Sequence, residues 1–208
     1  MSEKTLNEIG LKYGTDKASS GHNYLENYEY FLGKYKEKPI TLIEIGGLNG
    51  ASLKMWEEYF SKGKIVCLDV NPKVADFASD RIAVEIGNAG DRSILMSLID
   101  KHGIPEIIID DGSHRWDHQR IAFKTLFKHL ADCGFYIIED LHTSFEPNFA
   151  GQEDIPFIEI LFILSRYLQL RGQRARDFEQ IFNPELANIA KSIDSITFIS
   201  RSCIIKKK

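Results

Sequence analysis

Cysteine is scarce in this 208-residue sequence and follows no metal-binding or disulfide pattern. The three cysteines, Cys67, Cys133 and Cys203, are far apart, and none of them belongs to a C-x-x-C pair. An odd number of scattered thiols argues against a disulfide framework, and the absence of paired ligands argues against a zinc site. We therefore expect the protein to work in a reducing compartment.

The sequence also lacks a basic cluster and a long apolar run. Its formal net charge is −4, and its one run of consecutive lysines is Lys206–Lys208, so nothing favours nucleic acid or an anionic membrane as a partner. The most apolar run, residues 155–164, is too short for a membrane span and contains Glu159. The first ten residues show no signal-peptide pattern. These absences predict a soluble, cytoplasmic protein with no membrane span and no nucleic-acid partner.

What is present is an alternation of short apolar strands and amphipathic helices. With 43% hydrophobic residues, the chain can bury one sizeable core. Two alternating segments, 196–199 and 203–205, read as a closing hairpin. The pattern predicts an α/β, Rossmann-like fold with a mostly parallel seven-stranded sheet and a C-terminal antiparallel hairpin. The earlier strands are expected at 40–46, 64–70, 82–87, the isoleucine run after Glu106, and 134–141.

We expect one domain over residues 1–208. Residues 1–37 form a short N-terminal helical extension, and residues 143–190 form a helical insertion or lid. Within the insertion, residues 155–170 are apolar nearly all round, which indicates full burial or contact with another copy of the chain. We favour the subunit interface, and hence a homo-oligomer. Residues 171–180 are charged and loop-like, and we expect a loop able to fold over the site.

A glycine loop follows the first strand, where α/β proteins bind nucleotides. Its pattern is Glu44-x-Gly46-x-x-x-Gly50, ahead of an amphipathic helix. Glycines let a backbone approach a ligand closely, and the helix N-terminus offers unpaired N–H groups. The spacing departs from the G-x-G-x-x-G of dinucleotide enzymes and is typical of S-adenosylmethionine (SAM) methyltransferases. Asp69, at the end of the next strand, is placed to accept two ribose hydroxyls, although a plain polar strand end explains it nearly as well alone.

The stretch richest in chemistry is residues 106–118, EIIIDDGSHRWDH, where a buried strand leads into acids and histidines. The fifth strand ends similarly, in Glu139 and Asp140. If these strands are parallel neighbours, about 4.8 Å apart, then Asp111, Glu139 and Asp140 converge and repel one another unless a cation joins them. Oxygen ligands suit Mg²⁺, which can chelate two neighbouring hydroxyls of a sugar.

Three histidines lie near these acids in the sequence. His114 can accept the proton of an attacking hydroxyl. A lone histidine would be better explained as a satisfied residue at a helix start, but beside three acids we favour catalysis for His114. His118 is explained equally well as support for the site or as a structural residue, and His142 is a weaker alternative base.

Aromatic residues near the N-terminus favour packing over ligand binding. Tyr24 and Tyr28 lie on one stripe of a helix that we expect to begin near His22, and core packing is the preferred explanation for both. The preceding loop contains Lys17 among other polar groups, which by itself indicates a site only weakly.

Three motifs, in this order, resemble a known family. They are Tyr13-Gly-Thr-Asp-Lys17, Asp110-Asp-Gly-Ser-His114 and Glu139-Asp-Leu-His-Thr-Ser144. They are similar to the metal-dependent sugar O-methyltransferases of macrolide antibiotic (mycinamicin-type) and surface-glycan pathways, over most of residues 9–145 and in the final hairpin. The resemblance implies the class I SAM methyltransferase architecture, with SAM and Mg²⁺ as cofactors. The acceptor would be a sugar hydroxyl in a glycan, a nucleotide sugar or a glycosylated natural product.

The resemblance also implies roles for particular residues. Asp111, Glu139 and Asp140 would hold Mg²⁺, and His114 would be the general base. The residues expected to bind SAM are Glu44, Gly46, Gly47, Asn49, Ser52, Asp69, Asn88, Asp110 and Lys17. Candidate substrate contacts are Tyr24, His118 and His142.

Two positions depart from the family's pattern. Asn88 stands where many class I methyltransferases have an aspartate near the adenine, and Cys133 replaces the first glycine of a usual pair before the fifth strand. Larger family members carry an additional N-terminal domain. With about 40 residues before its sheet, this chain is expected to be a catalytic domain nearly alone.

Three other functions stay open on the sequence alone. The same metal site would serve a catechol or phenolic acceptor. A protein similar to the cephalosporin hydroxylases could hold Fe(II) with acid and histidine ligands, although three carboxylates with one histidine favour Mg²⁺. The third alternative is a non-catalytic nucleotide-binding protein, against which the complete set of base and metal ligands argues.

Overall fold

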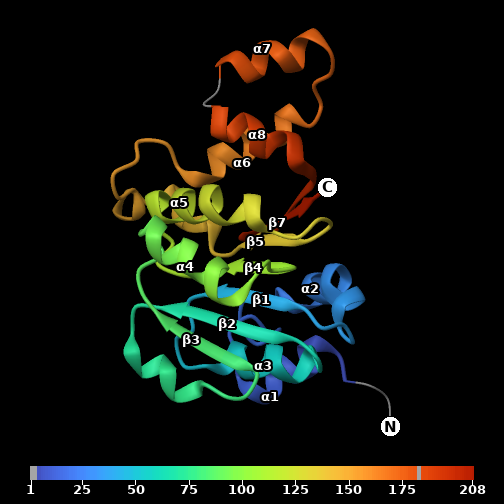
Figure 1. Ribbon diagram of the computed structural model, residues 1–208, viewed down its shortest axis with the longest axis vertical. Coiled ribbons are helices and arrows are strands. Elements are labelled where there is room, and N and C mark those ends of the chain that lie inside the picture. Colours follow the sequence, from blue (N-terminus) through green and yellow to red (C-terminus); the bar gives the residue numbers. More distant parts are fainter. Residues whose placement is uncertain (1–3, 182–183) are drawn as a thin grey trace. The chain divides into compact units, whose positions relative to one another are not determined.

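The structure, a computed structural model, describes residues 4–181 and 184–208 (Figure 1). The chain folds into two compact units, Met1–Asn88 (unit 1) and Ala89–Lys208 (unit 2). The seven strands follow the sheet order β3-β2-β1-β4-β5-β7-β6. This is the α/β architecture that the sequence predicts.

Unit 1 begins with two short helices, α1 (Leu6–Tyr13) and α2 (Leu25–Leu32), followed by a 3₁₀ turn, η1 (Gly33–Tyr35). A capping box starts α1, because the Thr5 side chain accepts the Glu8 N–H while the Glu8 side chain accepts the Thr5 N–H. Gly14 then ends α1 in the left-handed conformation. The predicted N-terminal extension is thus helical in these segments, and residues 1–3 lie outside the described part.

Three parallel strands form the sheet of unit 1: β1 (Thr41–Ile45), β2 (Lys64–Asp69) and β3 (Ile82–Ile86). The connections are α3 (Ala51–Tyr59) and the 3₁₀ helix η2 (Pro72–Phe77). Residues 42–45 of β1 are all buried, as expected for a parallel strand covered on both faces. The helix α3 packs against α1, which places Trp56 in the core.

In unit 2, strand β4 (Ile107–Asp110) pairs in parallel with β5 (Phe135–Ile138), with Asp110 opposite Ile138. Their ends therefore lie side by side, and the residues that follow each strand come close together. The predicted hairpin is confirmed as β6 (Ile193–Ile199) and β7 (Ser202–Lys207), with β7 antiparallel to β5. The helices of this sheet region are α4 (Arg92–His102), α5 (Trp116–Leu126) and η3 (Phe127–His129).

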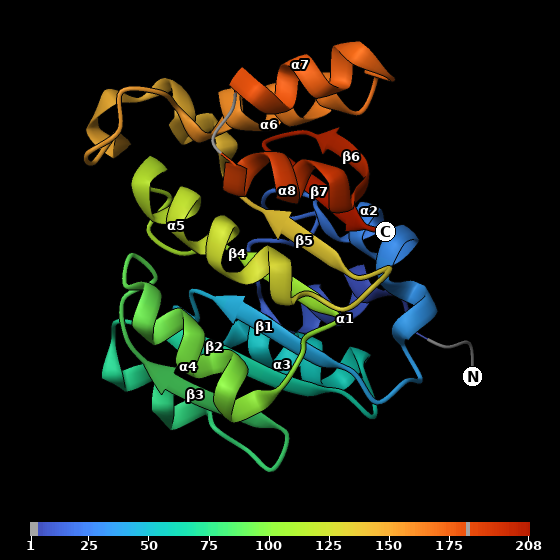
Figure 2. The ribbon, with the colours of Figure 1, turned by 45° about the horizontal axis from the view of Figure 1, so that its top comes forward.

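The region between β5 and β6 is largely helical, with η4 (Leu141–Phe145), η5 (Pro147–Phe149), α6 (Phe157–Tyr167), α7 (Gln173–Ile181) and α8 (Pro184–Ser192). Within unit 2, α7 lies farther from the strands than α6 and α8 do in both ribbon views (Figure 2). The prediction of a loop over residues 171–180 is wrong, because most of that segment forms α7. Glutamine, arginine and alanine favour helices, and Gln173 bonds to Asp177 and Arg176 along one face. Residues 182–183 lie outside the described part.

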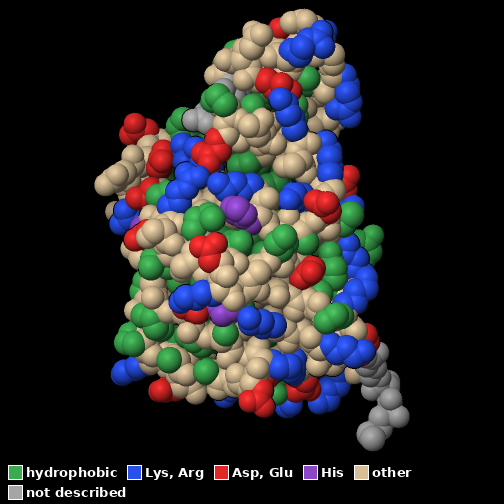
Figure 3. Space-filling view, in the orientation of Figure 1, with side chains coloured by type: hydrophobic (Ala, Val, Ile, Leu, Met, Phe, Trp, Pro, Cys, Tyr) green, Lys and Arg blue, Asp and Glu red, His purple; other side chains and the backbone are tan. Residues whose placement is uncertain are grey.

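No helix among the described residues is both long and apolar enough to cross a membrane. On the face shown in Figure 3, lysine and arginine side chains are interspersed with aspartate and glutamate.

Candidate active site

Two acids mark the end of β4, and their surroundings differ. Asp110 is 4% exposed and accepts hydrogen bonds from the Tyr136 hydroxyl, at 3.4 Å, and from the Gly112 N–H. Burial raises the pKa of Asp110 to about 7, because these bonds replace only part of the hydration that its charged form loses. The neighbouring Asp111 is less buried, and its negative charge raises the pKa of Asp110 further.

The residues after β4 and β5 include two that adopt an unusual backbone conformation. His114 has a φ of 56° and Asp140 a φ of 53°, both in the left-handed region. For residues other than glycine this conformation costs roughly 1–2 kcal/mol each, and it persists only where the surroundings enforce it. In this conformation the side chains of His114 and Asp140 both point into the same small region.

Asp111, His114 and Asp140 offer side-chain atoms that all lie within 4.8 Å of one another. His114 Nε2 is 4.0 Å from Asp111 Oδ1 and 3.6 Å from Asp140 Oδ2. Two carboxylates at this spacing fit a divalent cation that keeps other positions for water or an acceptor. The structure thus brings Asp111 and Asp140 together, as the sequence predicts, and metal binding by them stays a prediction.

Glu139 precedes Asp140 but is placed differently. It is 1% exposed, and its backbone N–H donates to the Asp110 carbonyl at 3.0 Å, which continues the β4–β5 pairing by one residue. Its carboxylate is not part of the group that Asp111, His114 and Asp140 form among the described residues. The role of Glu139 as a metal ligand therefore stays a prediction.

The other two candidate histidines lie at the border of this group. His118 Nδ1 is 2.8 Å from the Ser113 hydroxyl, so His118 holds the segment next to His114. Burial lowers the pKa of His118, which favours its neutral form. His142 Nδ1 is 4.0 Å from Asp140 Oδ1, and its side chain is 41% exposed.

In unit 1, the glycine loop is bound to the end of β2 through one carboxylate. Asp69 Oδ2 accepts the N–H of Gly47 at 2.7 Å and approaches that of Leu48 at 3.3 Å, while Oδ1 accepts the Asn71 N–H at 2.8 Å. Each carboxylate oxygen has two lone pairs, so Oδ2 is fully used and Oδ1 retains capacity for one ribose hydroxyl. Gly46 has a φ of 94°, and a Cβ at Gly47 would lie only 2.6 Å from Cys67 Sγ. The loop backbone therefore requires glycine at both positions.

A buried ion pair lies behind this loop. Glu44 is fully buried in β1, its Oε1 is 3.6 Å from Lys17 Nζ, and Lys17 is itself 1% exposed. The Ser52 hydroxyl of α3 donates to Glu44 Oε2 at 3.0 Å. Because a buried charge is costly without a partner, Lys17 and Glu44 secure the loop after α1 to the sheet of unit 1.

Comparison with known proteins finds no matching family model. An 8-demethyl-8-(2-methoxy-alpha-L-rhamnosyl)-tetracenomycin-C 3'-O-methyltransferase of Streptomyces olivaceus is 37% identical over 153 residues, which are 70% of this chain and 39% of that protein. A mycinamicin VI 2''-O-methyltransferase of Micromonospora griseorubida is 33% identical over 72% of this chain and 39% of that protein. A solved MycE methyltransferase from the mycinamycin biosynthetic pathway, in complex with Mg and SAH, matches 99% of this chain and 55% of its own, with a TM-score of 0.85 and 26% identity.

The chain is homologous to sugar O-methyltransferases. It spans less than half of the length of these two curated relatives and about half of the solved chain.

The remaining residues assigned by resemblance to the methyltransferases have varied surroundings. The Asn49 side chain accepts the Ala51 N–H at 3.1 Å and so supports the start of α3. Asn88 is exposed after β3. Tyr24 is 1% exposed and stacks between His22 and Tyr28, at centroid distances of 5.3 Å and 5.8 Å. Core packing, the preferred explanation of Tyr24 and Tyr28, is what the structure shows.

Cys133, which departs from the methyltransferase pattern, occupies a position suited to glycine. Its φ is 62°, in the left-handed region, and its side chain is exposed. The usual glycine there is explained by this backbone conformation, which cysteine adopts at some cost.

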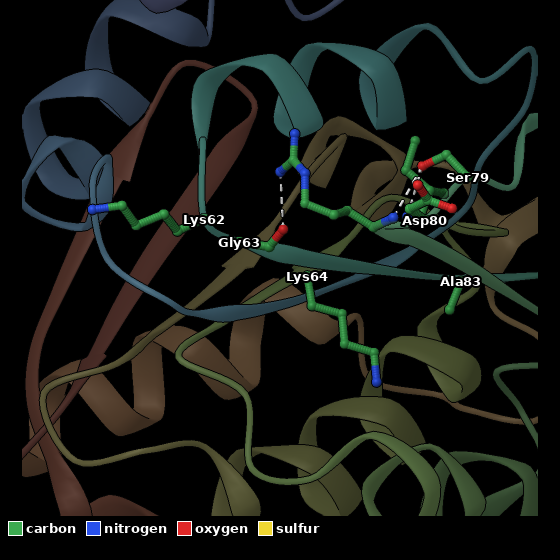
Figure 4. Close-up of a pocket in the computed structure, with 8 residues that line it drawn as sticks. Lys62, Gly63, Lys64, Ser79, Asp80 and Ala83 are labelled. Carbon is green, nitrogen blue, oxygen red and sulfur yellow. Dashed lines mark hydrogen bonds between the residues drawn. The ribbon is translucent and has the colours of Figure 1, made fainter.

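A cavity of about 300 Å³ lies in unit 1 (Figure 4). It is lined by residues 62–64 and 79–83, at the opposite end of β2 from Asp69. The Arg81 guanidinium beside it donates to the carbonyls of Phe60, Gly63 and Glu57. These bonds tie the start of β3 to the end of α3.

Two features of the candidate site were missed by reasoning from the sequence. One is the Lys17–Glu44 pair, whose only signal was a lysine in an otherwise turn-forming motif. The other is Thr143, which is 3% exposed and bonds to the Asp140 carbonyl. Its place in the motif Glu139–Ser144 was a signal, but no sequence rule shows which backbone groups a threonine will contact.

Proposed function

We propose that the chain is a SAM-dependent, Mg²⁺-dependent O-methyltransferase that acts on a hydroxyl of a sugar, in a glycan, a nucleotide sugar or a glycosylated natural product. The observation that carries the proposal is the convergence of Asp111, His114 and Asp140 at the ends of two parallel strands. The names of the relatives, which include a rhamnosyl-tetracenomycin and a mycinamicin O-methyltransferase, support the sugar acceptor.

In this proposal Asp111 and Asp140 hold the metal, with Glu139 as a further ligand. When bound, Mg²⁺ would acidify and orient the acceptor hydroxyl. His114 Nε2 faces the two carboxylates that would hold the cation. That nitrogen is therefore placed to take the proton of the acceptor hydroxyl. The left-handed conformations of His114 and Asp140 set these directions before any ligand arrives.

The residues of unit 1 serve the methyl donor. SAM supplies the methyl group, and the glycine loop, Asp69 and the Lys17–Glu44 pair form the proposed binding region. Asp69 fixes the loop through backbone N–H groups and keeps one lone pair, on Oδ1, for a ribose hydroxyl.

An Fe(II) enzyme is less well supported. The facial triad of such enzymes consists of two histidines and one carboxylate, whereas the group in the described residues has one histidine and two carboxylates. Oxygen-rich sites of this kind favour Mg²⁺.

The experiment that tests the function is calorimetric titration with SAM and with NAD, followed by transfer of labelled methyl from SAM to a panel of glycosides. We expect SAM to bind and NAD not to bind. Asp69→Ala should weaken SAM by roughly 1–3 kcal/mol if its hydrogen bonds to the ribose are lost. Binding of NAD without SAM would refute the proposal.

The predictions of a single domain over residues 1–208, a cytoplasmic location and a homo-oligomer belong to this proposal. Five apolar residues of α6 are buried within the chain, whereas Phe162 is 46% exposed. The Phe162 ring packs against that of Phe198 in β6, with the two ring centroids 5.2 Å apart. This exposed pair supports a subunit interface at α6 and β6. Analytical ultracentrifugation of wild type and Phe162→Ser tests it, and a monomeric wild type would contradict it.

A further inference from the structure

Thr143 joins the two strained residues of the candidate metal site. Its hydroxyl donates to the Asp140 carbonyl at 2.8 Å and lies 3.4 Å from the His114 carbonyl. The Thr143 backbone N–H also donates to the Asp140 carbonyl, at 3.0 Å. Thr143 is 3% exposed, so water does not compete for these bonds. One side chain therefore contacts the backbone of both left-handed residues.

Trp116 completes the link from the other direction. Its indole Nε1–H donates to the Thr143 carbonyl at 3.0 Å, and its side chain is 6% exposed. Trp116 is the first residue of α5, two positions after His114, whereas Thr143 follows β5. Hydrogen bonds thus run both ways between the segment that carries His114 and the segment that carries Asp140.

His114 and Asp140 are the two left-handed residues that this link joins. A left-handed backbone returns to a more favourable conformation unless neighbouring groups hold it, and the side chain then changes direction. Small displacements of ligand atoms weaken a metal site, and partners outside the ligand set commonly control such positions. We propose that Thr143 and Trp116 are positioning residues that hold Asp140 and His114 in the geometry that binds a divalent cation. The inference rests on the proposed function for the identity of the cation.

The test measures Mn²⁺ binding by calorimetry, in the absence of SAM and acceptor. Thr143→Val removes the hydroxyl and keeps the shape, and it should weaken Mn²⁺ about tenfold. Thr143→Ser keeps the hydroxyl and should stay within about twofold of wild type. Thr125→Val is the matched control, since Thr125 is also buried but lies near the other end of α5, and it should leave Mn²⁺ affinity unchanged.

Thermal unfolding in EDTA measures general stability apart from metal binding. Thr143→Val and Thr125→Val should both be less stable than wild type, because each loses a buried hydroxyl, but only Thr143→Val should lose Mn²⁺ affinity. Mn²⁺ affinity of Thr143→Val equal to wild type would overturn the inference and leave the proposed function standing. A wild type that binds no Mn²⁺ would overturn both. If Thr143→Val does not fold, Trp116→Phe replaces it. That variant removes the donor to the Thr143 carbonyl, and wild-type affinity for it would refute the link.

Discussion

Glu44 of unit 1 and the acids of unit 2 are held in different ways. Glu44 is fully buried with Lys17 as its cation and Ser52 as a donor, and Asp69 receives three backbone N–H groups within 3.3 Å. In unit 2, Asp111 and Asp140 are 21% and 16% exposed at their side chains and form ion pairs with histidines at 3.6–4.0 Å. The carboxylates of unit 1 are paired with a lysine or with hydrogen-bond donors of the chain itself, whereas Asp111 and Asp140 of unit 2 bring negative charge together at a partly exposed site.

The pKa shifts show the same contrast. In unit 1, the Lys12 ammonium and the Tyr13 hydroxyl lower the pKa of Glu58 to about 2. In unit 2, burial raises the pKa of Asp110 to about 7. The Glu58 carboxylate is thus stabilised as an anion, whereas the charged form of Asp110 carries a desolvation cost that a nearby cation would offset.

Replacing the proposed base should have the largest effect. We expect His114→Ala to keep its fold and SAM affinity yet lose roughly 10²–10⁴-fold in kcat. His118→Ala, which removes only the bond to Ser113, should be milder. Near-normal turnover of His114→Ala would move the base elsewhere, with His142 tested next.

Removing Lys17, the buried partner of Glu44, should have the largest effect on stability. Lys17→Met leaves the buried Glu44 carboxylate without its lysine, which should lower the free energy of unfolding by about 3–5 kcal/mol in urea denaturation. Lys17→Met combined with Glu44→Gln should recover most of the loss, because the uncompensated charge is then gone. A double variant as unstable as the single one would mean that packing, not charge, explains the effect.

For Asp110 the effect should depend on pH. The folded pKa of about 7 exceeds the ordinary value near 4, so the cost of its charge is absent below about pH 4 and complete above about pH 7. Asp110→Asn should therefore raise the free energy of unfolding by up to about 4 kcal/mol at pH 8, and by little at pH 4. Thermal unfolding in EDTA checks this, because a bound cation would itself lower the pKa. An equal gain at both pH values would contradict it.

Glu58 should give a smaller effect of opposite sign. Its lowered pKa stabilises the fold above about pH 4.5, and this contribution is lost as the pH falls toward about 2. The pair with Lys12 is partly exposed, so Glu58→Gln should cost less than about 1 kcal/mol at neutral pH. The same unfolding series measures it, and a loss that persists unchanged at pH 2 would contradict the assignment.

Most of the fold followed from the sequence because its strands are short and mainly apolar. The isoleucines after Glu106 predicted β4, and the alternation before Lys206 predicted the hairpin. The error at residues 171–180 arose because this charged segment has only two apolar side chains, Ala175 and Phe178, too short a pattern to distinguish a surface helix from a loop.

The candidate site was predictable in part. Strand ends in a parallel sheet place their following residues together, so the approach of Asp111 to Asp140 could be inferred. The left-handed conformations of His114 and Asp140 could not, because nothing in a local sequence shows that tertiary bonds from Thr143 and Trp116 will hold them. For the same reason the burial of Lys17 beside Glu44 was not foreseen.

Turnover with SAM and a glycosylated acceptor, with and without Mg²⁺, tests most directly the claim that the acids of unit 2 hold a metal for methyl transfer. We predict that EDTA abolishes turnover by the wild type and that Mg²⁺ restores it. Asp140→Asn should keep SAM affinity and lose about tenfold or more in turnover at saturating acceptor. Full turnover in EDTA, or an Asp140→Asn variant as active as wild type, would contradict the claim.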